Sequence, residues 1–206
     1  MLKIWGRANS SNVKKVTWLC EEIGLPYERI DAGLAYGVVN TPEYRKLNPN
    51  GLVPTIDDDG FILWESNAIV RYLAGKHAAG TLWPADPKVR ASADRWMDWC
   101  STTLAAAFTP VFINMVRVAP DKRNLQAIEE GAKKTVELLA RLDAALAGRN
   151  FINGDQFSMA DISFGGVTWL INNVAFDRPQ FANFDAWYAR IAARPAFKKV
   201  VALPVT

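Results

Sequence analysis

Every strand signal in this sequence falls within the first 80 residues. Short apolar runs bounded by turn residues predict strands over 2–5, 27–31, 54–57 and 61–64, and the helical period predicts helices over 12–23, 42–47 and 66–76. Only the helical period continues later. Long helices are predicted over 87–117, from after the break at 119–121 to about 147, over 158–173 and over 182–194. We therefore expect an α/β domain over residues 1–80 packed against an all-helical domain over residues 86–206.

Glycine, proline and small polar residues mark where these elements begin and end. Gly24 follows the first helix as a C-terminal cap, and Pro26 prevents the helix from continuing. Asp58-Asp59-Gly60 lies between two apolar runs and predicts a hairpin. Ser66 is expected to cap the N-terminus of the helix that follows it, and Pro195 is expected to close the helix that precedes it.

Composition and charge exclude several classes of function. The chain has 206 residues, 50% of them hydrophobic, which is typical of a folded globular protein. The net charge is only +3 and no basic tract occurs, so nucleic acid is not an expected partner. No apolar run approaches the roughly 20 residues that span a bilayer, and the N-terminal apolar stretch is too short for a signal peptide. We expect a cytoplasmic protein with no membrane partner.

The scarcity of cysteine and histidine limits the available chemistry. Cys20 and Cys100 lie far apart and form no CxxC motif, which indicates a reducing compartment rather than a disulfide framework. His77 is the only histidine, so Ser-His-Asp catalysis, Cys-His catalysis and a histidine-rich metal site are excluded. Chemistry must therefore depend on hydroxyls, amides, carboxylates or the reactive group of a cosubstrate, without a metal.

Two segments of the α/β domain carry groups suited to ligand binding. The Val53-Pro54 bond opens a strand and is either an ordinary trans bond or a cis bond, which would expose the Val53 backbone to an extended peptide-like ligand. Glu65 and Ser66 precede a helix. Ser66 either only caps this helix or also helps its N-terminus to hold a ligand carboxylate, with Glu65 pairing with the ligand ammonium group.

The segment from Arg7 to Asn12 links the first strand to the first helix. Its small polar residues either form a turn and a cap, or donate a hydrogen bond to a bound anion. A thiolate would gain from such a donor and from the helix dipole. Lowering the pKa of a thiol is a catalytic need, because a thiol of pKa about 8.5 is mostly protonated at pH 7.

A capping box is predicted at the start of the helix over 158–173. Ser158 and Asp161 have its S-x-x-D spacing, and Phe157 and Ile162 have the spacing of a hydrophobic staple. We therefore assign Asp161 to folding rather than to chemistry.

Taken together, these segments resemble the cytosolic glutathione transferases, especially the bacterial theta-like and beta-like members. The resemblance covers nearly all of the chain. It is carried by IWG at residues 4–6, KV at 15–16, EEIGLPYE at 21–28, PEY at 42–44, LNPNGLVPT at 47–55, WESNAI at 64–69, RYL at 71–73 and FSMADI at 157–162. Each piece is weak alone, whereas their order and spacing over about 160 residues are specific.

The resemblance implies a thioredoxin-like N-terminal domain with a cis Val53–Pro54 bond, a helical second domain, glutathione as cosubstrate and a homodimer. It implies that Val53 pairs its backbone with the cysteinyl part of glutathione, next to Pro54. Glu65 and Ser66 would hold the γ-glutamyl end.

At the glycyl end of glutathione the resemblance is less complete. Asn50 and Leu52 would lie along this end of the peptide. The family often has a basic residue near the position of Leu52, and leucine supplies no charge, so the partner of the glycine carboxylate stays open.

The same alignment gives three candidates for the group that stabilises the thiolate. Ser10 falls where theta-like members have their serine and is the first choice. Asn12 falls where some bacterial disulfide-reducing members have an asparagine and is the second, with Ser11 third. The beta-like cysteine is absent. The hydrophobic substrate is expected near Phe108, Thr109 and Phe112 of the first long helix, with Arg7 at the rim.

Three functions remain open from the sequence. The first is glutathione transfer to a small electrophile. The second is glutathione-dependent reduction of mixed disulfides or peroxides, in which Asn12 would matter more. The third is a binding protein that has kept the fold without catalysis, which is disfavoured because Glu65, Ser66 and the Val53-Pro54 pair are all present.

Overall fold

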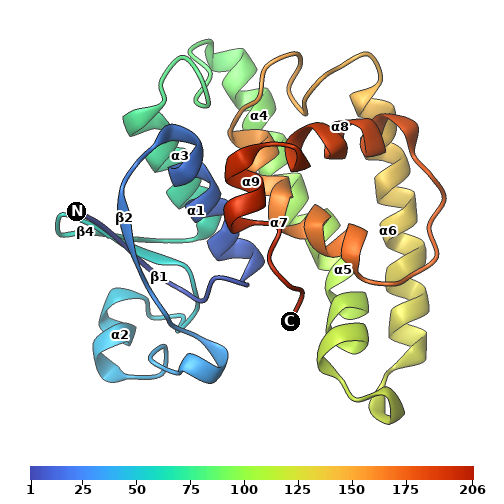
Figure 1. Cartoon of the computed structure of the whole chain (residues 1–206), viewed down its shortest axis with the longest axis horizontal. Coiled ribbons are helices and arrows are strands. Elements are labelled where there is room, and N and C mark those ends of the chain that lie inside the picture. The colour runs from blue at the N-terminus through green and yellow to red at the C-terminus, as the bar shows by residue number, and fades with distance from the viewer.

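The computed structural model describes residues 1–206 and consists of a sheet-containing N-terminal part and a helical remainder (Figure 1). The strands are β1 (Leu2–Trp5), β2 (Tyr27–Ile30), β3 (Thr55–Asp58) and β4 (Phe61–Trp64). The helices are α1 (Ser11–Ile23), α2 (Pro42–Leu47), α3 (Ser66–His77), α4 (Pro87–Trp99), α5 (Ala105–Phe112), α6 (Leu125–Leu146), α7 (Met159–Asn173), α8 (Ala182–Ala192) and α9 (Pro195–Val200). The predicted fold class is confirmed, because a thioredoxin-like sheet with helices precedes an all-helical part.

The sheet is built around β1. Its strand order is β2-β1-β3-β4, with β1 parallel to β2 and antiparallel to β3. The parallel pair requires a crossover connection, which α1 provides. The predicted hairpin joins β3 to β4 through Asp59 and Gly60, both at positive φ, as a two-residue hairpin turn requires. β3 begins one residue later than predicted, because Pro54 has no N–H to donate to a neighbouring strand.

Helix α1 lies between the sheet-containing part and the helical part (Figure 1). It packs against α3 on one side and against α7 and α9 on the other. The eight consecutive residues 13–20 are all buried, although the sequence pattern predicts only one apolar face. The helix ends as predicted at Gly24, which is in the left-handed region at φ 64°. The start of α1 is therefore held in place by both parts of the molecule.

One predicted helix cap is wrong, and one predicted helix end has a second role. Ser66 is not the N-cap of α3 but its first residue, and Glu65 occupies the cap position without a side-chain cap hydrogen bond. Pro195 does not simply end a helix, because it is the first residue of α9. Proline is well suited to a first helical position, where its missing N–H has no partner to lose.

The predicted helix over 87–117 is continuous but not uniform. α4 and α5 are joined by a π-helical turn at Cys100–Leu104, and a second π-helical turn at Ile113–Arg117 ends the helix. Contrary to expectation, this 31-residue helix contains an 18-residue window of mean hydropathy 1.3, enough by length and composition to cross a membrane. One such helix is weak evidence for a membrane span. Two of its apolar side chains, Phe108 and Phe112, line a cavity.

The predicted capping box at the start of α7 is confirmed and extends into the core. Asp161 is fully buried, and its Oδ2 accepts a hydrogen bond from the Ser158 N–H at 3.0 Å. Its Oδ1 accepts from the Ile152 N–H at 2.9 Å and from the Trp187 Nε1–H at 2.8 Å. Burial raises the pKa of Asp161 to about 6, so the carboxylate is ionised at neutral pH. The side chain thus joins α7, α8 and the loop before α7.

Asp161→Ala should destabilise the protein by about 3 kcal/mol or more. Three buried N–H groups lose their acceptor, at roughly 1 kcal/mol or more each. Urea unfolding at pH 7.5 measures this change, and Asp121→Ala, at an exposed position, should shift the free energy of unfolding by only about 0.5 kcal/mol. Activity per folded molecule should change little. A large loss of turnover with unchanged unfolding would contradict the structural role.

Candidate functional site

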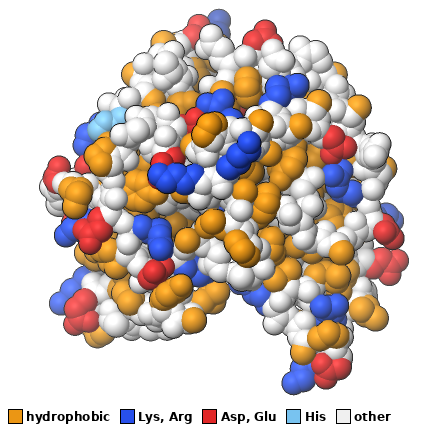
Figure 2. Space-filling model, in the orientation of Figure 1, with side chains coloured by type: hydrophobic (Ala, Val, Ile, Leu, Met, Phe, Trp, Pro, Cys, Tyr) orange, Lys and Arg blue, Asp and Glu red, His pale blue; other side chains and the backbone are white.

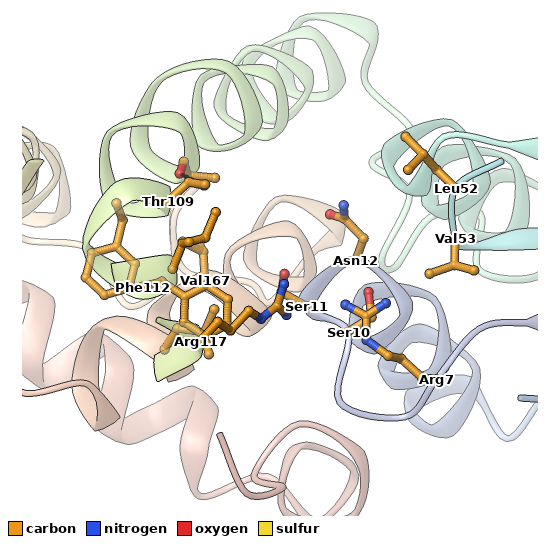
Figure 3. A pocket seen from close by; sticks show the side chains of 14 residues that line it. Arg7, Ser10, Ser11, Asn12, Leu52, Val53, Thr109, Phe112, Arg117 and Val167 are labelled. Carbon is orange, nitrogen blue, oxygen red and sulfur yellow. Dashed lines mark hydrogen bonds between the residues drawn. The ribbon is translucent and has the colours of Figure 1, made fainter. Parts of the chain in front are cut away.

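A cavity of about 280 Å³ lies between the start of α1 and the helices α5 and α7. Figure 2 shows a recess between the two parts of the molecule, with hydrophobic and basic side chains along its edge. Nine of the thirteen site residues predicted from the sequence line this cavity: Arg7, Ser10, Ser11, Asn12, Leu52, Val53, Phe108, Thr109 and Phe112. The other lining residues are Ala105, Ile113, Arg117, Val167 and Leu170. One wall is therefore polar and the facing wall apolar (Figure 3).

The polar wall is the first turn of α1. Ser10 is the N-cap, and its Oγ accepts a hydrogen bond from the Val13 N–H at 3.5 Å. Ser10 is only 6% exposed, whereas Asn12 is exposed. All three predicted donors, Ser10, Ser11 and Asn12, lie at the positive end of the helix dipole. This wall is suited to an anion.

Helix α7 fixes the position of that turn. Gly166 approaches Ser11 so closely that a Cβ on Gly166 would lie 2.5 Å from the Ser11 carbonyl oxygen. The contact is made by backbone atoms, which cannot rotate away as a side chain can. The spacing between α7 and the first turn of α1 therefore depends on glycine at this position.

The Val53–Pro54 bond is cis, as the resemblance implies. The Val53 N–H and C=O make no hydrogen bond within the chain. The loop is braced instead at Leu52, whose carbonyl oxygen accepts hydrogen bonds from the Tyr44 OH at 2.7 Å and the Asn48 Nδ2–H at 3.0 Å. Val53 is thus held with both backbone groups free, in the wall of the cavity.

Asn50 and Pro54 do not line the cavity. Asn50 donates from its backbone N–H and its Nδ2 to Asn48 Oδ1, at 3.1 and 3.2 Å, and its side chain is exposed. Pro54 is buried beneath the loop.

Glu65 and Ser66 also lie outside the cavity lining but are connected to it. The Ser66 Oγ–H donates to Asn12 Oδ1 at 3.3 Å, which links the start of α3 to the start of α1. Glu65 is exposed and has φ 72° and ψ 111°, an unusual conformation for a residue with a side chain. Such conformations cost free energy and are concentrated at functional sites.

Lys15 lies directly behind Ser66 and was not singled out by the sequence. It is 5% exposed, and its Nζ donates to Ser66 Oγ, Asn67 Oδ1 and Ser101 Oγ, each at 3.3 Å. Burial lowers the pKa of Lys15, and the nearby Glu65 opposes that shift. The three hydrogen-bond partners of Lys15 are all neutral side chains, and two of them belong to the first turn of α3.

Two arginines extend into the cavity from its two sides, and the sequence indicated only one of them. Arg7 comes from the loop after β1, and Arg117 comes from the C-terminal end of the long helix. Arg117 was missed because a charged residue at a helix end is ordinarily a solvated side chain. No cluster of three or more His, Cys, Asp or Glu side chains that could hold a metal ion occurs in the chain.

Comparison with protein families gives a match in each part of the chain. Residues 1–75 match the model described as Glutathione S-transferase, N-terminal domain. Residues 126–190 match the model described as Glutathione S-transferase, C-terminal domain.

Individual proteins match over the whole length. The chain is 42% identical to Glutathione S-transferase GstB of Escherichia coli (strain K12), with 100% of both sequences covered. It is 34% identical to Glutathione S-transferase 3 of Zea mays, covering 98% of this chain and 93% of the relative. A crystal structure of the theta class glutathione S-transferase from Xanthomonas axonopodis pv. citri with glutathione bound matches with a TM-score of 0.96 and 45% identity, covering 100% and 99% of the two chains.

Gly166→Ala should destabilise the protein by about 1–3 kcal/mol, because the added methyl group forces α7 away from the backbone of Ser11. Gly75→Ala in α3 is the matched control. A Cβ there would meet only ordinary contacts at 3.7 Å, so the better helix propensity of alanine should add about 0.5–1 kcal/mol. Urea unfolding compares the two variants, and equal stabilisation of both would show that α7 does not constrain α1.

Proposed function

The chain belongs to the glutathione S-transferase family, and from this premise we propose that its cavity holds the thiol of glutathione as a thiolate that attacks a small electrophile. The observation that carries this proposal is the shared cavity itself. The first turn of α1, with three hydrogen-bonding side chains, faces the apolar side chains of α5 and α7 across it. A thiolate and an apolar electrophile would therefore meet between the two walls.

We propose that glutathione lies along the edge formed by Val53 and the start of α3. The free N–H and C=O of Val53 are arranged to pair with the cysteinyl part of the peptide. The γ-glutamyl carboxylate would lie at the N-terminus of α3 on Ser66, in the positive potential of Lys15. The exposed Glu65 would pair with the ligand ammonium group.

Ser10 is the proposed thiolate donor, with Asn12 as the second candidate. Ser10 Oγ accepts from the Val13 N–H through a lone pair, so its own hydrogen remains free to donate to sulfur. Asn12 Oδ1 accepts from the Ser66 Oγ–H, which leaves the Asn12 amide hydrogens free as well. Reduction of disulfides or peroxides is the alternative function, because Asn12 lines the same cavity.

We propose that residues 1–80 form the glutathione-binding domain and residues 86–206 the domain that contributes the electrophile site. We also propose a cytoplasmic homodimer. In support of a protein partner, β4 is at the edge of the sheet and leaves Phe61 49% and Trp64 36% exposed.

Glu65→Gln should weaken glutathione binding by about tenfold or more. The carboxylate–ammonium hydrogen bond is charge-assisted and worth roughly 1.5–3 kcal/mol, and 1.4 kcal/mol corresponds to a factor of ten. Calorimetry with glutathione measures the change. Glu129→Gln, on the exposed surface of α6, removes the same charge outside the cavity lining and should leave the affinity unchanged. Equal affinities of the two variants would remove Glu65 from the site.

Ser10→Ala should shift the pH profile of conjugation to higher pH by about one to two units. Loss of one donor to the thiolate costs roughly 1–3 kcal/mol, and one pKa unit corresponds to 1.36 kcal/mol. Glutathione affinity should stay within a few fold, and activity should persist because the helix dipole and Asn12 remain.

Asn12→Ala is the comparison for this experiment. A shift in Asn12→Ala without one in Ser10→Ala would make Asn12 the donor and favour the disulfide-reducing function. Unfolding of both variants is measured in parallel, because Ser10 also caps α1 at a cost of about 1 kcal/mol when lost.

A further inference from the structure

Arg7 presents a charge to the cavity that the protein does not neutralise. Its Nε is buried and has no hydrogen-bond partner. Neither Arg7 nor Arg117 forms a salt bridge within the chain, although both line the cavity. The apolar wall beside them makes this lack of partners costly, because a charge near low-dielectric surroundings is poorly solvated.

The guanidinium groups of other partly buried arginines donate at least one hydrogen bond; Arg123, whose Nε is also buried without a partner, still donates from Nη2 to the Met115 carbonyl oxygen at 2.9 Å. Arg29 pairs with Asp31, Arg178 pairs with Asp185 at 3.1 Å, and Arg71 pairs with Asp94 at 2.8 Å. The absence of any hydrogen-bond partner for the Arg7 guanidinium is therefore not a general feature of the partly buried arginines in this protein. A buried guanidinium without an acceptor is expected where a ligand supplies the acceptor.

The second arginine increases the positive potential. Burial lowers the pKa of Arg7, and the neighbouring charge of Arg117 lowers it further. Arginine side chains carry a positive charge at neutral pH. Two like charges that share a cavity repel each other, and one anion between them would relieve that repulsion and the unpaired donors together.

Arg117 places one member of the pair on the apolar wall, where the electrophile is proposed to lie. Arg117 stacks on Phe112, with its guanidinium carbon 4.7 Å from the ring centroid, so it belongs to the apolar wall. The Arg7 guanidinium lies over Gly33, where an added Cβ would be 3.3 Å from a terminal nitrogen. Figure 3 shows the side chains of Arg7 and Arg117 extending toward each other, with their ends next to Ser10 and Ser11 in this view.

We propose that this enzyme prefers electrophiles that carry a carboxylate, which Arg7 and Arg117 hold while the apolar part of the substrate lies against α5 and α7. The inference rests on the proposed glutathione transfer and names its substrate class. A carboxylate suits the guanidinium geometry because it accepts two parallel N–H hydrogen bonds. The anchored group would orient the reactive carbon toward the thiolate at the start of α1.

A pair of matched substrates tests the proposal, 4-(bromomethyl)benzoate and 4-(bromomethyl)benzamide. In both, the glutathione sulfur forms a bond to the benzylic carbon, and bromide leaves with the electron pair of the broken C–Br bond. The thiol proton has passed to solvent when the thiolate forms. The two substrates share ring and leaving group and differ only in the charge of the remote group, so we expect a higher kcat/KM for the benzoate.

Arg7→Gln and Arg117→Gln should each reduce this preference. The loss in kcat/KM for the benzoate should exceed the loss for the benzamide by about tenfold or more in Arg7→Gln, as expected for a charge-assisted hydrogen bond. Arg149→Gln removes an exposed arginine distant from the cavity and serves as the control. This variant should keep the preference of the parent protein for the benzoate.

Other outcomes would overturn the proposal. Equal losses for both substrates would show that the arginines act on the thiolate. A raised KM for glutathione with an unchanged preference for the benzoate would show that Arg7 binds the glycine carboxylate instead.

A binding measurement separates this inference from the proposed function. Calorimetry with unreactive 4-methylbenzoate and 4-methylbenzamide needs no glutathione and no turnover. Tighter binding of 4-methylbenzoate than of 4-methylbenzamide, lost in Arg7→Gln, would support the carboxylate site. If neither bromomethyl substrate were conjugated, that failure would count against the transferase mechanism but not against the carboxylate site. Equal binding of the two probes to the parent protein would overturn the carboxylate site.

Discussion

Gly166 brings α7 so close to the backbone of Ser11 that the two helices have no room for a Cβ between them. Most of α1 is buried between the sheet-containing part and the helical part, so its first turn cannot shift without moving both. The polar wall of the cavity is this turn, and the apolar wall belongs to α5 and α7. The contact between α1 and α7 therefore constrains the separation of the two walls, and with it the distance between the proposed thiolate and its proposed target.

Basic side chains lie both behind the proposed glutathione site and within the cavity. Lys15 lies behind Ser66 with neutral hydrogen-bond partners, while Arg7 and Arg117 lie in the cavity without a salt-bridge partner. The α1 dipole adds positive potential between them. In the proposed function these groups would favour anions at three places: the γ-glutamyl carboxylate, the thiolate and the anionic part of an electrophile. The protein carries a net charge of only +3, so the positive potential comes from placement rather than from excess charge.

Much of the fold follows from local sequence signals. The alternation of apolar residues, the turn at Asp59 and Gly60, the cap at Gly24 and the capping box at Asp161 each act over a few neighbouring residues. The errors have local causes too. Ser66 has the residue type of an N-cap, yet the backbone reaches α3 through a positive φ at Glu65, a conformation set by the surrounding structure and invisible to residue preference.

The sequence by itself determined the fold class, the family resemblance and most of the cavity lining, because these depend on periodicity and on residue order. The tertiary structure alone decided which charges are left without partners. Lys15 is the fifth residue of α1, and Arg117 lies 110 positions after Arg7. The sequence spacing of Arg7 and Arg117 does not indicate that both side chains line one cavity, because their separation is set by how α1, α5 and α7 pack. The electrostatic character of the site is therefore a property of packing.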